Sequence, residues 1–432
     1  MLQSPFLAGS LEAKLKVVRD YAKLLGGSGG RLVLSLLYFT AVANSLSVSA
    51  FGLFATASAT GIVLSRIAGL GFVSPLYRAA TRKPHLVGTY TAGLLAAFAL
   101  SMPLVVLAGA LFFVLVFAGD MGLAAFAAIV AAEVVCWRAL EVVCIVNNGM
   151  NRFGRASVLV VVGTGMKALA AVLFAALAPQ SGLLGWSLFY LGANAVSAIS
   201  GILALYPRQR LRWRPDLYKR RAADSFAVAG AEVLFYLQSE LDKLLVLSLG
   251  GPHIAGLYAM LMRLIDLTAL PVRSFNMMVV QKLMRSPAWL NSWRMRWGIE
   301  GAIALVSAGG LAAFGVILHI RPTLLGTNVA DAAPLVLLVL LVPAFRNLVE
   351  YEGELLYAQG RTGVRAAVLA FLTVLKAGFL AVILGNGAAS DTGWVIGLNG
   401  VFGALWLASA MTTYLVLDMR RGGRLRSATV AG

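Results

Sequence analysis

Residues 86–119 read LVGTYTAGLLAAFALSMPLVVLAGALFFVLVFAG and contain no charged side chain. An α-helix needs about 20 apolar residues to cross the hydrocarbon core of a bilayer. This run exceeds that length, no cluster of turn residues divides it, and Asp120 ends it. It therefore predicts one long, tilted membrane-spanning helix near residues 87–117.

The composition of the whole chain extends this conclusion. Of its 432 residues, 60% are hydrophobic and 12% are charged, against about 25% charged residues in soluble domains. So little charge cannot cover a water-soluble body of this size, which excludes a soluble enzyme, a disordered chain and a small disulfide scaffold. Cys136 and Cys144 lack CxxC spacing, and three histidines are too few for a metal centre. The sequence predicts an all-α integral membrane protein that is not an enzyme.

Eleven further stretches resemble the first in length and apolar character. The uncharged run 168–207 holds two of them, because PQSG (179–182) forms a turn within it. The twelve predicted spans lie near residues 31–50, 53–76, 87–117, 121–146, 157–178, 183–206, 225–249, 254–280, 298–319, 332–356, 366–385 and 393–417. Small residues recur every four positions in the second span, which predicts close helix packing; they are Ala57, Gly61, Ser65 and Gly69.

Basic residues are distributed unequally between the two sides of these spans. With both termini cytoplasmic, 27 of the 36 Lys and Arg residues lie in cytoplasmic segments, eight lie within spans, and Arg321 alone lies outside. The positive-inside rule describes this pattern, and one span more or fewer would invert it. The formal net charge of +18 therefore reports topology, and no nucleic-acid partner is predicted.

The most basic stretch, PRQRLRWRPDLYKRRAAD (207–224), divides the spans six and six. It predicts an N-terminal six-helix bundle over residues 1–206, a cytoplasmic linker over 207–224, and a C-terminal six-helix bundle with a basic tail over 225–432. The segment before the first span mixes basic and apolar residues. It fits an interfacial amphipathic helix, and an ordinary cytoplasmic lead-in fits it equally well.

Two short matches relate the halves to each other. GLFA at 52–55 corresponds to GLYA at 256–259, an offset of 204 residues, and RFG at 152–154 corresponds to RTG at 361–363, an offset of 209. Both pairs fall at equivalent points of the predicted topology. Internal repeats are frequent in transporters, so the matches favour two parallel bundles; chance similarity of apolar segments is the alternative.

A longer stretch, residues 225–275, reads SFAVAGAEVLFYLQSELDKLLVLSLGGPHIAGLYAMLMRLIDLTALPVRSF. With Gln238 and Asp242 in mid-helix, a glycine turn, Gly-x-Tyr-Ala and Pro-x-Arg, it resembles the seventh and eighth helices of the polysaccharide repeat-unit flippases. The second span and NRFGR (151–155) extend the resemblance over most of the chain. The family belongs to the multidrug/oligosaccharidyl-lipid/polysaccharide exporter superfamily, which also holds drug extruders and lipid II flippases.

The resemblance implies two six-helix bundles in a V around a central cavity, working by alternating access. It implies a monomer that flips undecaprenyl-pyrophosphate-linked oligosaccharides across the bacterial inner membrane for lipopolysaccharide or exopolysaccharide synthesis. Membrane lipids, a polysaccharide polymerase and chain-length proteins are the expected partners. A cation-coupled exporter of small organic compounds is one alternative, and a non-transporting membrane assembly subunit is another.

Ionisable residues inside spans usually face a cavity or a partner, because burying them in lipid costs a few kcal/mol. Several can pair along their own helix; these pairs are Arg138–Glu141, Glu240–Lys243, Arg263–Asp266 and Arg346–Glu350. Arg66 and Arg273 have no acid three or four residues away.

These two arginines are predicted pyrophosphate ligands, because guanidinium groups bind phosphate oxygens bidentately. Pairs with acids of the fourth or seventh helix are the alternative. Lys167, Lys376 and Arg346 are further candidates for the cavity. Asn44 would meet sugar hydroxyls or bond to a neighbouring helix.

The seventh span carries the candidates for ion coupling. Glu232, Glu240 and Lys243 share one face of the predicted helix, and Asp242 lies off that face. A carboxylate among apolar helices can carry a proton, so Glu240 or Asp242 could couple transport to a proton or sodium gradient, as in an antiporter. Salt bridges between the bundles are the alternative. No Walker A sequence occurs, and no cofactor is predicted.

Overall fold

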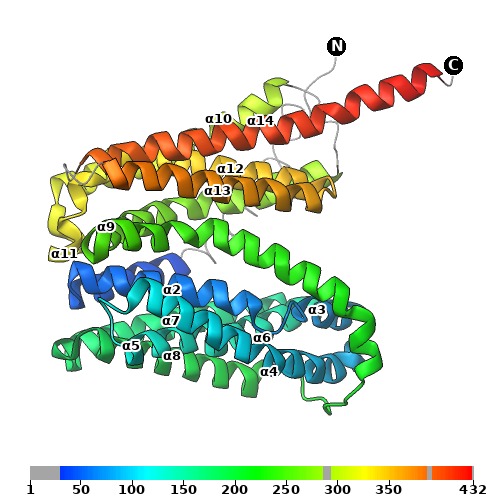
Figure 1. Ribbon diagram of the computed structural model, residues 1–432, viewed down its shortest axis with the longest axis horizontal. Coiled ribbons are helices and arrows are strands. Elements are labelled where there is room, and N and C mark those ends of the chain that lie inside the picture. The colour runs from blue at the N-terminus through cyan, green and yellow to red at the C-terminus, as the bar shows by residue number, and fades with distance from the viewer. Residues whose placement is uncertain (1–29, 286–292, 387–391, 431–432) are drawn as a thin grey trace, which may run out of the picture.

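The computed structural model describes residues 30–285, 293–386 and 392–430, and every regular element in these ranges is a helix (Figure 1). The first helix covers residues 30–45 of the described chain. The N-terminal half continues with α2 (Val48–Ile67), α3 (Val73–Arg82), α4 (Val87–Phe112), α5 (Leu123–Ala131), α6 (Arg138–Gly149), α7 (Phe153–Leu177) and α8 (Gly182–Leu205). Short π-helical segments, Phe113–Phe117 and Ala132–Trp137, extend α4 and join α5 to α6.

The C-terminal half begins with the longest helix, α9 (Pro215–Arg285), which is interrupted by the non-helical backbone of Gly251. Its other helices are α10 (Trp293–Ile320), α11 (Thr327–Ala330), α12 (Val342–Ala358), α13 (Thr362–Asn386) and α14 (Gly393–Val430). In Figure 1, α9 runs between the helices of the N-terminal half and those of the C-terminal half.

Each predicted span overlaps a described helix, so the all-α membrane fold is confirmed. Eight of the described helices are long and apolar enough to cross a membrane, or nine if the bent pair Thr327–Leu335 and Leu337–Ala358 is one span. That criterion counts α9 once, although α9 contains both the seventh and the eighth predicted spans. The predicted turn at 179–182 is a 3₁₀ turn over Pro179–Ser181 that separates α7 from α8.

The second predicted span, 53–76, is wrong in its last third. The helix ends at Ile67, and Gly69, Leu70 and Gly71 have φ angles of 81°, 49° and 71°. A Cβ atom at Gly71 would lie 2.1 Å from the carbonyl oxygen of Ser225, so only glycine fits there. The chain therefore leaves the span and turns into the short amphipathic helix α3.

The boundaries of two other predicted segments differ from the structure. The predicted linker, 207–224, is non-helical only in its first part, because α9 already begins at Pro215. The tenth span, 332–356, starts as short 3₁₀ turns and becomes regular at Val342. The division into bundles at 206 and 225 stays a prediction, and the predicted N-terminal amphipathic helix lies outside the described residues.

An aromatic cluster holds three helices of the N-terminal half together. Trp186 of α8 is fully buried, and its ring centroid lies 5.5 Å from those of Phe54 in α2 and Phe174 in α7. Aromatic pairs at this separation add to the free energy gained by burial alone.

We expect Trp186→Ala to destabilise the protein by about 3–5 kcal/mol, because it removes a large side chain from a site with no room to collapse. Thermal unfolding in detergent would show this as a lowered Tm. Trp213→Ala is the matched control, since Trp213 is 63% exposed. An equal loss of stability in both variants would contradict the role given to the cluster.

The two glycines of the matched GLFA and GLYA segments contact each other. A Cβ at Gly52 would lie 2.4 Å from the nitrogen of Gly256 and 2.5 Å from the carbonyl oxygen of Pro252, and a Cβ at Gly256 would lie 2.1 Å from the carbonyl oxygen of Val48. At the offset of 204, residue 48 corresponds to 252 just as 52 corresponds to 256. Such reciprocal contacts are what a two-fold axis between the segments produces.

This glycine contact lies at one end of the molecule. The basic loops 82–83, 152–155, 207–214 and 361–365 join helices at the opposite end, which we call the basic end. In Figure 1, α2 and α9 approach each other beside α11, and the two halves diverge toward α3. Near α11 the halves are therefore packed backbone to backbone, and at the basic end a second close contact joins Gly71, before α3, to Ser225 of α9.

Candidate functional site

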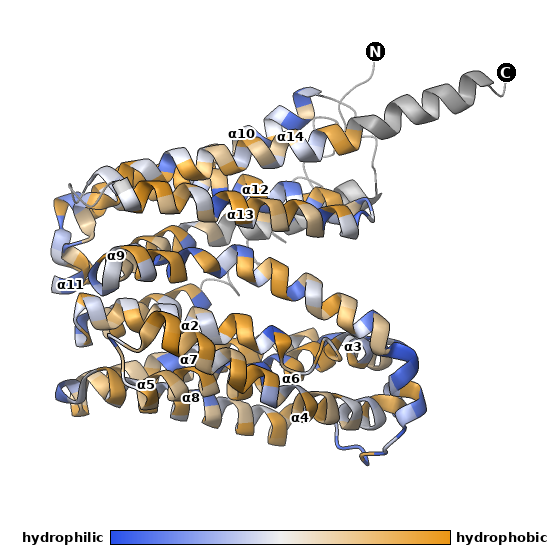
Figure 2. Ribbon diagram, viewed as in Figure 1, coloured by the Kyte–Doolittle hydropathy of each residue, from blue (hydrophilic) through white to orange (hydrophobic). Residues whose placement is uncertain are grey.

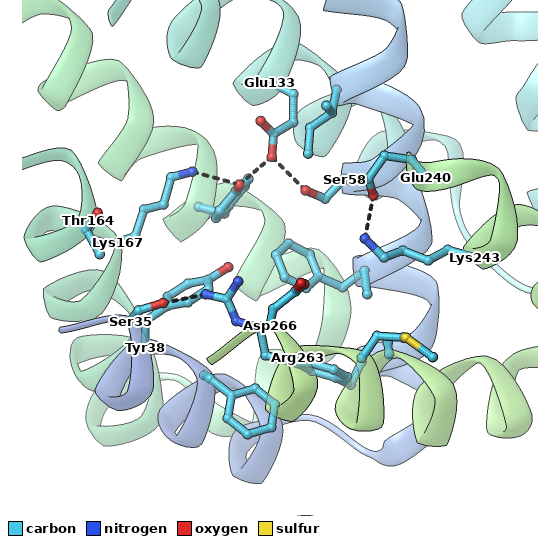
Figure 3. A pocket seen from close by; sticks show the side chains of 18 of the residues that line it. Ser35, Tyr38, Ser58, Glu133, Thr164, Lys167, Glu240, Lys243, Arg263 and Asp266 are labelled. Atoms are coloured by element: carbon cyan, nitrogen blue, oxygen red, sulfur yellow. Dashed lines mark hydrogen bonds and ion pairs between the residues drawn. The ribbon is translucent and has the colours of Figure 1, made fainter. Parts of the chain in front are cut away.

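A central cavity of about 410 Å³ lies between the first helix, α2, the segment joining α5 to α6, α7, α8 and both parts of α9 (Figure 3). Aromatic side chains form much of its wall; they are Tyr38, Phe39, Phe51, Phe54, Trp137 and Tyr190. Its bases are Arg31, Lys167, Lys243 and Arg263, and its acids are Glu133, Glu240 and Asp266. The cavity thus combines flat apolar surfaces with charges of both signs.

Glu133 anchors one wall of the cavity and is 2% exposed. Its Oε1 accepts hydrogen bonds from the hydroxyls of Ser58 at 2.6 Å and Tyr190 at 2.5 Å. Lys167 donates to the Tyr190 hydroxyl at 3.1 Å, and its Nζ lies 4.0 Å from the centroid of the Trp137 ring. The carboxylate and the ammonium group therefore share one tyrosine hydroxyl (Figure 3).

Arg263 and Lys243 belong to the opposite wall, formed by α9. Arg263 donates to the hydroxyl of Ser35 in the first helix at 2.7 Å, so it links the two halves. Lys243 pairs with Glu240 as predicted. The predicted partner of Arg263, Asp266, instead lies 3.4 Å from Arg346.

A second cavity of about 350 Å³ adjoins the first and shares Glu240 and Asp266 with it. Arg346 and Lys376 line it. Lys376 lies 3.2 Å from Asp242 and donates to the carbonyl oxygen of Gln238 at 2.8 Å. The other carboxylate oxygen of Asp242 accepts from the Tyr258 hydroxyl. Lys376, a candidate substrate ligand, and Asp242, a candidate coupling residue, therefore form a buried ion pair with each other.

Arg66 sits in a separate ion network. Its guanidinium donates to both carboxylate oxygens of Glu141 at 2.8 Å and stacks 4.0 Å from the centroid of the Tyr236 ring. Arg138 joins the same network, 2.8 Å from Glu141 and 3.1 Å from Glu232. In this conformation Arg66 therefore pairs with an acid of the fourth predicted span, as the alternative for this residue predicted, whereas Glu232 of the seventh span pairs with Arg138. The side chain of Arg273 lies outside the described residues.

Asn44 lies at the end away from the basic loops. Its side-chain amide donates to the carbonyl oxygen of Leu325 at 2.6 Å, and its side-chain oxygen accepts from the Asn328 backbone at 3.2 Å. In this conformation it joins the first helix to the segment around α11. Within the described chain no group of three or more His, Cys, Asp or Glu residues could hold a metal ion.

The predicted site residues thus fall into four places. Lys167, Glu240 and Lys243 line the central cavity. Lys376 and Arg346 line the adjoining one, where Lys376 pairs with Asp242. Arg66 and Glu232 belong to the Arg66 network, Asn44 lies near α11, and the side chain of Arg273 is outside the described residues. Neither Glu133 nor Arg263 was predicted as a site residue from the sequence, which placed Arg263 only in a pair with Asp266. Glu133 could have been found from the sequence, because it is an acid inside a predicted span with no base three or four residues away.

The proteins found to be similar to this chain are similar in structure, not in sequence. No protein-family model and no curated protein sequence matches the chain. An inward-facing multidrug resistance MATE family transporter of the MOP superfamily has a TM-score of 0.64 at 15% identity, covering 90% of this chain and 95% of its own.

Two other solved structures share the fold. The lipid II flippase MurJ in an inward closed conformation has a TM-score of 0.61 at 12% identity, covering 90% of this chain and 86% of its own. A MOP superfamily transporter from Pyrococcus furiosus, described as having a binding pocket of reverse polarity, has a TM-score of 0.59 at 15% identity over 92% and 95%. At these identities the likeness establishes the fold and leaves the substrate open.

Proposed function

We propose that this protein is a flippase that moves undecaprenyl-pyrophosphate-linked oligosaccharides across the bacterial inner membrane by alternating access. The observation that carries the proposal is a pair of cations in the central cavity. Lys167 and Arg263 donate to neutral hydroxyls, of Tyr190 and Ser35, and no ion pair within the described residues joins either cation to a carboxylate. Their positive charge is therefore available to the two phosphates of an anionic ligand.

The rest of the cavity suits the other parts of such a substrate. The aromatic wall offers faces on which sugar rings can stack, and the serine and tyrosine hydroxyls offer hydrogen bonds. The polyprenyl tail would remain in the bilayer between the diverging halves. A monomer acting beside a polymerase and chain-length proteins is part of the proposal.

Four residues of α9 remain proposed coupling residues. Three of them are paired with bases, Glu232 with Arg138, Glu240 with Lys243, and Asp242 with Lys376. We add Glu133, which accepts from two neutral hydroxyls inside the cavity. A proton or sodium gradient would drive transport.

Glu133 also favours the second candidate function, a cation-coupled exporter of small organic compounds. A buried carboxylate facing aromatic side chains is a suitable site for an organic cation. The fold is shared with a multidrug resistance transporter. This candidate differs from the first in the sign of the charge that the cavity has to recognise.

The variants Lys167→Met and Arg263→Gln test the first function. Each is expected to slow flipping by roughly 10- to 100-fold, because a hydrogen bond to a charged group contributes about 1.5–3 kcal/mol. The assay uses proteoliposomes containing an undecaprenyl-pyrophosphate-linked oligosaccharide and follows its loss of access to an added lectin.

Arg321→Gln is the control, since Arg321 is exposed and does not line the cavity. Normal flipping by both cavity variants at normal protein levels would refute the pyrophosphate site. If dye efflux needs Glu133 while oligosaccharide flipping is absent in the wild-type protein, the exporter is the correct function.

A further inference from the structure

Outside the central cavity, the basic end holds a second cleft with a different composition. Its volume is about 570 Å³, and it lies between α3 and the first turns of α9. Five of its ten lining residues are basic: Arg78, Arg82, Lys83, Arg220 and Arg221. None of the ten is acidic. Figure 2 shows a strongly hydrophilic patch where α9 begins beside α3.

The fold, rather than a local run of sequence, brings these cations together. Arg82 and Lys83 end α3, whereas Arg220 and Arg221 lie about 140 residues later in the second turn of α9. The bend at Gly69–Gly71 turns α3 away from the α2 axis and places it beside α9, because Gly71 packs directly on Ser225. The two walls of the cleft are therefore held by the backbone.

Other features of the fold account for only part of this charge. Basic residues at the end of α3 are favoured by the helix dipole, and Arg78 pairs with Asp224 at 2.5 Å. Neither effect applies to Arg220 and Arg221, which lie near the positive end of the α9 dipole. Asp216 and Asp224 lie at helical spacing from them, but Asp224 pairs with Arg78, and within the described residues no ion pair joins either acid to Arg220 or Arg221. The charge of these two arginines is balanced best by an anion that enters the cleft from outside.

The remaining lining residues indicate what kind of anion fits. Pro75, Leu86, Tyr90 and Leu217 give the cleft an apolar part beside its cations. It lies where the apolar run of α4 begins, since Leu86 and Tyr90 line it. Basic pockets at this level of a membrane protein bind lipid headgroups. A soluble phosphate would gain nothing from the apolar part.

We propose that the cleft between α3 and α9 binds the phosphate headgroup of an anionic phospholipid of the cytoplasmic leaflet. Arg220 and Arg221 contact the phosphate from one wall, and Arg82 and Lys83 contact it from the other. The bound lipid ties α3 of the N-terminal half to the start of α9. This site is separate from the central cavity and does not depend on the transported substrate.

The test measures lipid binding to the purified full-length protein by native mass spectrometry in detergent. The probes are phosphatidylglycerol, cardiolipin and phosphatidylcholine, with inorganic pyrophosphate as a soluble competitor. The wild-type protein is expected to retain the two anionic lipids and not phosphatidylcholine. Arg220→Gln/Arg221→Gln and Arg82→Gln/Lys83→Gln are each expected to weaken retention by about 30-fold, since each surface cation contributes about a factor of five.

Arg212→Gln/Arg214→Gln is the matched control, because it removes the same charge from exposed residues of the same basic stretch that do not line the cleft. Unchanged retention in this control supports a built site. Equal loss in the control would overturn the proposal in favour of general surface attraction. Displacement of the lipid by millimolar pyrophosphate would overturn it in favour of a soluble phosphate ligand.

Discussion

Replacing Gly256 with leucine is expected to slow transport by roughly 10- to 100-fold while leaving the protein folded. A Cβ at this position would lie 2.1 Å from the carbonyl oxygen of Val48, and both sides of the contact are backbone, so neither can rotate away. Overpacking of this kind costs about 1–3 kcal/mol or more, and about 1.4 kcal/mol changes an equilibrium tenfold. The conformation closed at this end would become rare, and alternating access needs it in every cycle.

The proposed change of conformation can be measured directly. Ala55 lines the central cavity, so a cysteine placed there reports whether the cavity is open to the side away from the basic loops. In a background where Cys136 and Cys144 are replaced by alanine, a membrane-impermeant maleimide applied from that side should label Ala55→Cys faster when Gly256→Leu is present. Gly52→Leu should act in the same way, because its contact is the reciprocal one.

Gly192→Leu is the control for adding a large side chain to a helix glycine. Gly192 is exposed on α8, and no described atom lies within 4 Å of a Cβ placed there. This variant should transport and label like the parent protein. Normal transport by Gly256→Leu, with unchanged labelling at position 55, would show that the glycine contact is not needed for closure.

Much of the fold could be predicted because span length and charge asymmetry are local properties of the sequence. The break after Ile67 could not be predicted, since glycines in an apolar run serve two purposes. Gly61 allows close packing as expected, with a Cβ there only 2.8 Å from the Glu133 side chain. Gly69 continues the same four-residue spacing but adopts a φ of 81° and ends the helix. What distinguishes the two uses is tertiary contact: the Gly69 N–H donates to the Ser101 hydroxyl of α4 at 3.0 Å, and Gly71 packs on Ser225 of α9.

The site was predictable to the extent that its contacts are local. Arg138–Glu141 and Glu240–Lys243 follow from helical spacing and are present. The bond from Arg66 to Glu141 depends on how α2 and α6 are rotated against each other, which sequence periodicity in a nearly uniformly apolar helix does not reveal.

The single variants Asp242→Asn and Lys376→Met are each expected to lower the free energy of unfolding by about 3–5 kcal/mol. Their side chains are both 4% exposed and lie 3.2 Å apart, so removing one charge leaves the other buried without its partner. The double variant should recover most of this loss, because it buries no charge. Thermal unfolding of the wild-type protein, the two single variants and the double variant in detergent provides this double-mutant cycle.

A pair nearer the surface provides the comparison for this cycle. Arg365 and Glu354 lie 2.8 Å apart with side chains 22% and 33% exposed. Replacing either one is expected to cost about 1 kcal/mol or less, since partly solvated pairs contribute little. Similar losses in the two cycles would contradict the idea that burial makes the Asp242–Lys376 pair critical.

Transport by the double variant then separates a structural role of Asp242 from a coupling role. A folded protein that still equilibrates substrate but no longer responds to a proton or sodium gradient would identify Asp242 as a coupling residue. A folded protein with normal gradient dependence would leave coupling to Glu133, Glu240 or Glu232.

Lys167 allows a second comparison between a transport role and a structural role. It occupies the position equivalent to Lys376 at the 209-residue offset, but it donates to a tyrosine hydroxyl instead of pairing with a buried acid. Lys167→Met should therefore impair transport far more than stability, and Lys376→Met should impair both.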